Sequence, residues 1–497
     1  MIRVLSTCLF LLFSYFLYAQ ISRNISPEKS HQDIDSQAYI ERAHLLYTTN
    51  TLAREHETNT PYFALGYPAI MGLLFKIFGE SKIIIILFQV LLSLCISFLI
   101  FLTARRLFSI RVAQITALLF SCNLGFLVFS QFILTETCLV FFLVLFFERF
   151  SDFLVTHKSS SLITAGISLG CSVIIKPAAL YFPILLVPLI FIVTSEKIQT
   201  PGSYRALALP VLRSHLGVGG KAWISVGGGV SQLYLIFLLL VSFAVPITIY
   251  SVHNKYVFGS YKQGSLDQVN IYFWFFPHVL AQENGTNSDI ERAYLINLNN
   301  HDPLFTPVKK LFWQKLTHNP VRFIIVWLKN VFKTTVGLYT TNLKVLVDPN
   351  VHGGDISFFR INGTLLQKIH NYIVAGTSFC WVKTIGYLEA CWSVIRYLLC
   401  LLGFIGLIRD RRYKELYFFS TYLFYFSCIT GHDGCARFRM LFEFVLVILA
   451  AYGLCLIIGC IKNNRVTKKN NQKRGLGHDE THESATIFSR VCASKRG

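Results

Sequence analysis

The sequence predicts an all-α polytopic membrane protein that crosses the bilayer about ten times. Of its 497 residues, 53% are hydrophobic, only 14% are charged and 44 are phenylalanine. Apolar runs of about 20 residues, long enough to span a bilayer, recur along the chain. The expected spans are 4–21, 83–102, 112–129, 134–148, 161–176, 178–194, 232–250, 388–408, 414–430 and 440–461.

The formal net charge of +20 is distributed as in a membrane protein with cytoplasmic ends. Basic residues gather after alternate spans, as at Arg105, Arg106 and Arg111, and again in the tail. Because cytoplasmic loops are enriched in Lys and Arg, both termini are predicted to be cytoplasmic and residues 22–66 to lie outside. This distribution argues against nucleic-acid binding, and the tail is expected to contact at most anionic lipid.

The predicted spans divide the chain into four regions. Residues 1–250 form a transmembrane core with the first outer loop at 22–66, and 251–387 form a small outer domain. C-terminal transmembrane helices follow at 388–461, and 462–497 form a basic cytoplasmic tail. The Gly-rich segment 217–229 predicts a flexible cytoplasmic linker.

Two apolar segments allow more than one interpretation. Residues 4–21 are either an uncleaved first helix or a signal peptide, and the poor cleavage pattern favours the helix. Residues 323–341 carry Lys329 and Lys333, which favours an interfacial amphipathic helix over an extra span. The 13 cysteines lie mostly in apolar runs, and no Cys/His spacing predicts a zinc site.

An acidic pair just after the first span is the most informative polar feature. Asp33 and Asp35 precede or begin a helix expected over 34–46. In such a helix Asp35 and Tyr39 share a face, whereas residues two apart point in nearly opposite directions. One carboxylate can then address a given site, or either aspartate is simply the helix N-cap.

Several short motifs follow in a fixed order along the first 460 residues. They are Asp35-Ser36-x-x-Tyr39, Asn59-Thr60-Pro61-Tyr62, Gly66-Tyr67-Pro68, Leu134-Thr135-Glu136, Lys176-Pro177 and Ala436-Arg437-Phe438-Arg439. This order resembles the GT-C superfamily of polyprenyl-phosphate-sugar-dependent glycosyltransferases. The closest resemblance is to the bacterial branch related to protein O-mannosyltransferases and to the aminoarabinose transferase of lipid A.

The resemblance implies an inverting sugar transfer at the outer face of a membrane, here the bacterial inner membrane. Asp35 would be the general base that deprotonates the acceptor hydroxyl. The donor would be a polyprenyl-phosphate-linked sugar, and the acceptor a lipid, a glycan or a protein. Cations would stabilise the departing lipid phosphate, and the candidates are Lys176, Arg437 and Arg439. Snorkelling at the interface is the alternative for these three residues.

The remaining site residues have open roles. Glu136 either orients the acceptor or the base, holds a divalent metal with Asp33, or is a first-turn acid that the helix dipole favours. Asp33 and Tyr39 are expected to bind substrate. Arg396 lies within an apolar run and stays unassigned, although such residues are often functional. His432-Asp433 is interpreted as part of a loop between spans.

Two other function classes compete with the glycosyltransferase. A transporter or lipid flippase is disfavoured because no internal repeat is evident and the polar groups gather at outer helix ends, not at mid-membrane. A degenerate member that serves as an assembly factor is disfavoured by the presence of Asp35, Glu136 and Lys176 together.

Overall fold

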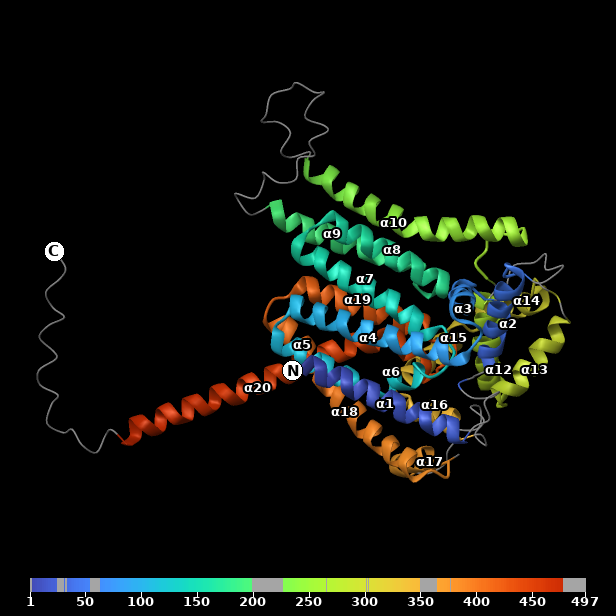
Figure 1. Ribbon diagram of the computed structural model, residues 1–497. Coiled ribbons are helices and arrows are strands. Elements are labelled where there is room, and N and C mark those ends of the chain that lie inside the picture. Colours follow the sequence, from blue (N-terminus) through green and yellow to red (C-terminus); the bar gives the residue numbers. More distant parts are fainter. Residues whose placement is uncertain are drawn as a thin grey trace, which may run out of the picture.

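The computed structural model describes ten stretches of the chain, and within them every regular element is helical (Figure 1). Asp33 and residues 217–226 of the Gly-rich segment lie outside them. The all-α fold class is therefore confirmed for the described residues, which are 2–24, 31, 34–53, 63–198, 227–264, 266–300, 302, 304–348, 364–375 and 377–476.

The long helices run side by side as a bundle (Figure 1). Among the described residues, five stretches are long and apolar enough to cross a membrane, so the chain is an integral membrane protein. The total of about ten spans stays a prediction. The helices that contain these stretches are α1 (Ile2–Asn24), α4 (Lys82–Leu107), α10 (Gly227–Phe258), α18 (Cys380–Arg409) and α20 (Met440–Leu476).

Shorter helices fill the bundle between them. Most are apolar on all sides, as is typical of helices buried among other helices or facing lipid. They are α3 (Gly66–Phe78), α5 (Ile110–Ser121), α6 (Leu124–Phe129), α7 (Glu136–Thr156), α8 (Ser159–Ile175), η1 (Pro177–Ala179), α9 (Phe182–Ile198) and α19 (Tyr413–Ile429).

Helices α18 and α20 pack closely because glycines face the partner helix. A side chain at Gly453 of α20 would collide with the backbone carbonyl of Leu399, and one at Gly403 of α18 with that of Leu449. Small residues permit such backbone approach in membrane helix pairs. This contact sets the spacing of two helices that carry buried charges, described below.

A second group of helices lies at the right-hand end of the bundle in Figure 1. It has its own apolar core, which includes Phe276, Leu295, Phe312 and Phe323. The helices are α11 (Leu266–Val269), the π-helix η3 (Asn270–Phe275), α12 (Phe276–Asn284), α13 (Ser288–Asn299), α14 (Thr306–His318) and α15 (Pro320–Val336). Helices α2 (Ile34–Thr49) and α16 (Thr340–Val347) contribute buried residues to the core of the bundle instead, and α17 (Leu365–Val374) packs against α18.

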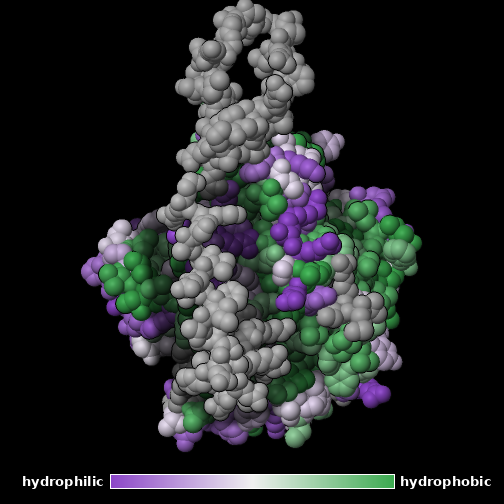
Figure 2. Space-filling model, turned by 90° about the vertical axis from the view of Figure 1, so that its left-hand side faces the viewer, coloured by the Kyte–Doolittle hydropathy of each residue, from purple (hydrophilic) through white to green (hydrophobic). Residues whose placement is uncertain are grey.

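Helix α15 covers most of the segment 323–341, and its position at the membrane interface stays a prediction. Its buried side includes Phe323 and Val326, whereas Ile324, Leu328 and Phe332 are exposed. The opposite end of the bundle, seen in Figure 2, presents hydrophilic residues in its middle and hydrophobic ones toward its sides. The division into domains and the side of the membrane on which each end lies remain predictions.

Candidate active site

Four charged side chains from separate elements meet beside α2. Asp35 lies in the first turn of α2, Glu136 begins α7, Lys176 follows α8, and Arg437 lies in η5 (Ala436–Arg439). Arg437 donates through Nη2 to Asp35 Oδ2 at 3.0 Å and through Nε to Glu136 Oε1 at 2.6 Å. Lys176 Nζ donates to the same Glu136 oxygen at 3.4 Å. We call these four residues the Arg437 cluster.

Exposure rises steadily across the Arg437 cluster. The side chain of Glu136 is 0% exposed, those of Arg437 and Lys176 are 12% and 13% exposed, and that of Asp35 is 47% exposed. A carboxylate as buried as Glu136 needs charged partners, and two cations supply them. Glu136 is thus a buried carboxylate that holds two cations in place, and Asp35 is a solvent-exposed carboxylate beside them.

Aromatic rings line the cationic side of the cluster. Lys176 Nζ lies 4.7 Å above the centre of the Phe438 ring, and the His432 ring lies 4.8 Å from the same ring. Burial, with a smaller contribution from the Lys176 charge, lowers the pKa of His432 to about 4. His432 is therefore neutral at pH 7 and adds no third positive charge to the site.

Tyr39 fixes the orientation of α2 at the site. It is buried one helical turn after Asp35 and makes edge contacts with the rings of Phe63 and Tyr67. Burial, and then the nearby Asp35 carboxylate, raises the pKa of Tyr39 well above its usual range. Tyr39 thus remains a neutral phenol that packs behind Asp35.

The structure thus brings together five of the residues named from the sequence, namely Asp35, Tyr39, Glu136, Lys176 and Arg437. Asp33 lies outside the described residues. Arg439 does not join the Arg437 cluster: it is fully buried, and its Nε donates to Glu443 Oε2 at 2.7 Å. Among the described residues, no group of three or more His, Cys, Asp or Glu is suited to hold a metal ion.

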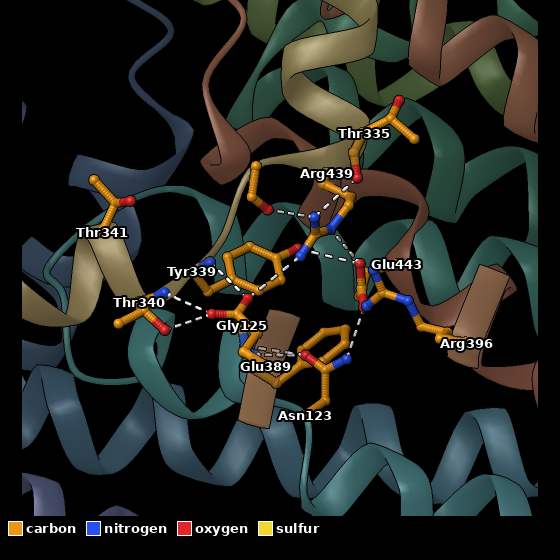
Figure 3. Close-up of polar contacts among 12 residues, drawn as sticks. Asn123, Gly125, Thr335, Tyr339, Thr340, Thr341, Glu389, Arg396, Arg439 and Glu443 are labelled. Atoms are coloured by element: carbon orange, nitrogen blue, oxygen red, sulfur yellow. Dashed lines mark hydrogen bonds and ion pairs between the residues drawn. The ribbon is translucent and has the colours of Figure 1, made fainter. Parts of the chain in front are cut away.

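Sequence reasoning gave Arg396 no partner, and the structure supplies one. Arg396 of α18 is buried and pairs with Glu443 of α20 (Figure 3). The available signal was the presence of Glu389, Arg396 and Glu443 inside apolar runs, because isolated charges there are costly and tend to pair. Which residues pair across helices cannot be read from that signal.

Part of the chain matches a family of known proteins. A family model described as dolichyl-phosphate-mannose-protein mannosyltransferase matches residues 62–216, which include Glu136 and Lys176. Over these residues the chain is similar to a family of membrane mannosyltransferases. The resemblance inferred from the motif order is therefore confirmed over residues 62–216, and glycosyl transfer by this chain is taken up as a proposal below.

Solved structures of an oligosaccharyltransferase are also similar to this chain. The archaeal enzyme AglB from Archaeoglobus fulgidus, in complex with an inhibitory peptide and a dolichol-phosphate, is 12% identical with a TM-score of 0.46. That match covers 94% of this chain and 52% of the other. The apo form of the Archaeoglobus fulgidus oligosaccharyltransferase is 13% identical, with a TM-score of 0.45 and the same coverage. The chain spans about half the length of these structures, and no curated protein matches it.

Proposed function

We propose that this chain transfers a sugar from a polyprenyl-phosphate carrier to an acceptor at the outer face of the membrane. The observation that carries the proposal is the Arg437 cluster, in which an open carboxylate adjoins two held cations. Sugar transfer from a lipid phosphate needs these two functions side by side: a base for the acceptor and positive charge for the leaving group.

Asp35 is the proposed general base. Arg437 engages its Oδ2 atom, and the acceptor hydroxyl approaches the other carboxylate oxygen. The hydroxyl proton passes to Asp35 as the acceptor oxygen bonds to C1 of the sugar. The bond from C1 to the phosphate oxygen breaks on the opposite side, and its electron pair remains on the phosphate. A single displacement of this kind inverts the configuration at C1.

Lys176 and Arg437 are the proposed partners of the leaving phosphate. The phosphate gains negative charge as the bond to the sugar breaks, and preformed cations stabilise that charge in a site with little water. Glu136 touches both cations, so its proposed role is to hold them in position. Tyr39 supports Asp35 from behind and is proposed to position that carboxylate.

The acceptor is proposed to enter between the Arg437 cluster and the second group of helices, to which α15 belongs. Helix α15 reaches the site through Asn330, whose Nδ2 donates to the His432 carbonyl at 3.3 Å. A lipid, a glycan or a protein hydroxyl remains a candidate acceptor. We place the protein in a bacterial inner membrane with this site facing the periplasm, because of the basic residues at the other helix ends.

The test is a transfer assay on membranes that contain the full-length protein. The first donor is dolichyl-phosphate-mannose with radiolabelled mannose, because the matching family is described by that donor. Asp35→Asn should lower the transfer rate by about 10²–10⁴-fold, since an amide accepts no proton at neutral pH. The matched control is Asp410→Asn, a partly exposed aspartate that Arg409 holds at 2.9 Å.

Two results would overturn the proposal. One is that membranes with the wild-type protein transfer no more label than membranes without it, across a panel of polyprenyl-phosphate sugars. That result would favour the non-catalytic interpretation. The other is near-normal transfer by Asp35→Asn, which would require a different base.

A further inference from the structure

A second set of buried charges surrounds Arg439, which follows Arg437 by two residues in the chain (Figure 3). Its side chains come from the start of α6, the start of α16, α18, η5 and α20, and all are buried. The set contains two arginines and two glutamates, so its formal charges cancel. We call it the Arg439 cluster; its members are Asn123, Tyr339, Thr340, Glu389, Arg396, Arg439 and Glu443.

Arg439 is the centre of this cluster because it bonds to three parts of the chain. Its Nε donates to Glu443 on α20, and its Nη1 donates to the carbonyls of Thr335 and Gly337 at 2.9 and 2.5 Å. The guanidinium lies 4.2 Å from the centre of the Tyr339 ring. Arg439 therefore ties η5 to the connection between α15 and α16.

The two glutamates are themselves held firmly. Glu443 Oε1 accepts from Asn123 Nδ2 at 2.8 Å and from Arg396. Glu389 accepts from the backbone N–H groups of Tyr339 and Thr340 at 2.6 and 2.8 Å, and also from the Thr340 hydroxyl at 2.6 Å. Because each carboxylate accepts from several donors, the positions of both glutamates are well defined.

The fixed arrangement matters for Arg437 because both arginines lie on η5. This segment is a single 3₁₀ turn, in which successive side chains are about 120° apart. Arg437 and Arg439 consequently diverge, one toward Asp35 and the other into the core. Since 3₁₀ hydrogen bonds have poorer geometry than α-helical ones, an unrestrained η5 would tend to continue α20 as α-helix, at about 100° per residue. That change would redirect Arg437.

We propose that Arg439, together with Glu443 and Glu389, is a positioning residue that fixes η5 and thereby directs Arg437 at the donor phosphate. The inference rests on the proposed function for the role of Arg437. It assigns Arg439 a part in the reaction without contact to substrate, in place of the donor contact expected from the sequence.

The experiment measures binding of polyprenyl phosphate, without a sugar, to the purified full-length protein, together with the melting temperature of each variant. The test variants are Glu443→Gln, which is isosteric, and Arg439→Lys, which keeps the charge but loses the planar fork. The matched control is Glu148→Gln. Glu148 is also fully buried and pairs with two arginines, Arg106 and Arg149, but it lies in the last turns of α7.

We expect Glu443→Gln and Glu148→Gln to lower the melting temperature alike. Glu443→Gln and Arg439→Lys should in addition weaken polyprenyl phosphate binding by about tenfold or more, because small misplacements at a site are costly. The control Glu148→Gln should bind polyprenyl phosphate like the wild type. If Glu443→Gln yields no folded protein, Arg439→Lys decides the question. An Arg437→Met variant is measured alongside them.

Three outcomes would each overturn either the donor contact of Arg437 or the positioning role of Arg439. If Arg437→Met binds polyprenyl phosphate like the wild type, the proposed donor contact of Arg437 fails. If Arg437→Met weakens binding but Arg439→Lys and Glu443→Gln bind like the wild type, the positioning inference fails while the donor contact stands. Equal loss of binding in Glu148→Gln also overturns it, because general destabilisation would then explain the effect.

Discussion

Arg437 and Arg439 are separated by one residue in the chain but lie in opposite surroundings. Arg437 holds a carboxylate that is open to solvent, whereas Arg439 is enclosed by acids and backbone carbonyls. Charges are rare inside membrane proteins because each is costly to desolvate, so each group of them requires a reason. The two clusters illustrate two such reasons: an open group offers charge to a substrate, and a closed group fixes structure.

The comparison also distinguishes what each cluster contributes to stability. An ion pair with one exposed partner adds little net free energy, because solvent screens it. Removing one partner from a closed pair leaves a buried charge without compensation, which is strongly destabilising. Substitutions in the Arg439 cluster should therefore act on stability, and substitutions at the open end of the Arg437 cluster on activity.

The largest expected effect is on stability. Glu443→Ala should lower the free energy of unfolding by about 3–5 kcal/mol, because Arg396 and Arg439 both lose their carboxylate. Asp35→Ala should lower it by less than about 1 kcal/mol. Thermal unfolding of the purified full-length variants measures both. An Asp35→Ala variant as unstable as Glu443→Ala would remove the distinction between an open and a closed cluster.

The next effect is on activity. Arg437→Met should lower transfer from dolichyl-phosphate-mannose by about 10²–10³-fold, as expected when a stabilising donor at a developing charge is lost. The control is Arg412→Met, because Arg412 is also partly buried and paired with a glutamate, Glu415. Equal losses of transfer in the two variants would show that Arg437 has no special place in the reaction.

A third prediction concerns the pH dependence of stability and His31, which lies between α1 and α2. His31 is buried, stacks on Tyr18 and contacts the Gln131 carbonyl through Nδ1 at 3.0 Å. Burial lowers the pKa of His31 to about 4. Between pH 6.5 and 4 the unfolded chain therefore binds a proton that the folded chain does not, so stability falls as pH falls, by at most roughly 3 kcal/mol from this residue.

The variant His31→Asn isolates this contribution. Asparagine tolerates the positive φ of 62° at residue 31 and has an amide that can donate to the carbonyl. Melting temperatures measured from pH 7 to pH 4.5 should fall less steeply in the variant than in the wild type. Parallel slopes would contradict the assignment of a lowered pKa to His31.

The smallest expected effect is at Lys176. Lys176→Ala should weaken use of the lipid-linked donor by about tenfold, because one of two cations is lost while Arg437 remains. Lys176→Arg should retain part of the activity, since the positive charge persists beside Glu136. The KM for dolichyl-phosphate-mannose measures the effect. Indistinguishable KM values for Lys176→Ala and the wild type would restrict donor binding to Arg437.

The sequence predicted the bundle and indicated all four members of the Arg437 cluster, for different reasons. Apolar runs identify spans directly, and the order of short motifs indicated Asp35, Glu136, Lys176 and Arg437. Arg437 and Arg439 are two positions apart and point in different directions, and sequence alone does not show which of them faces Asp35 and which faces the core. The partner of Arg396 was missed because Glu443 is 47 residues away and only helix packing brings them together.

The central claim is that the open cluster meets the donor phosphate while the closed cluster stays intact. A cryo-EM structure of the full-length protein with bound polyprenyl phosphate tests it most directly. We predict that phosphate oxygens lie within hydrogen-bond distance of Arg437 and Lys176, with Asp35 nearby and the bonds of Arg439 to Glu443 unchanged. A phosphate bound away from Arg437, or one in contact with Arg439, would contradict this account.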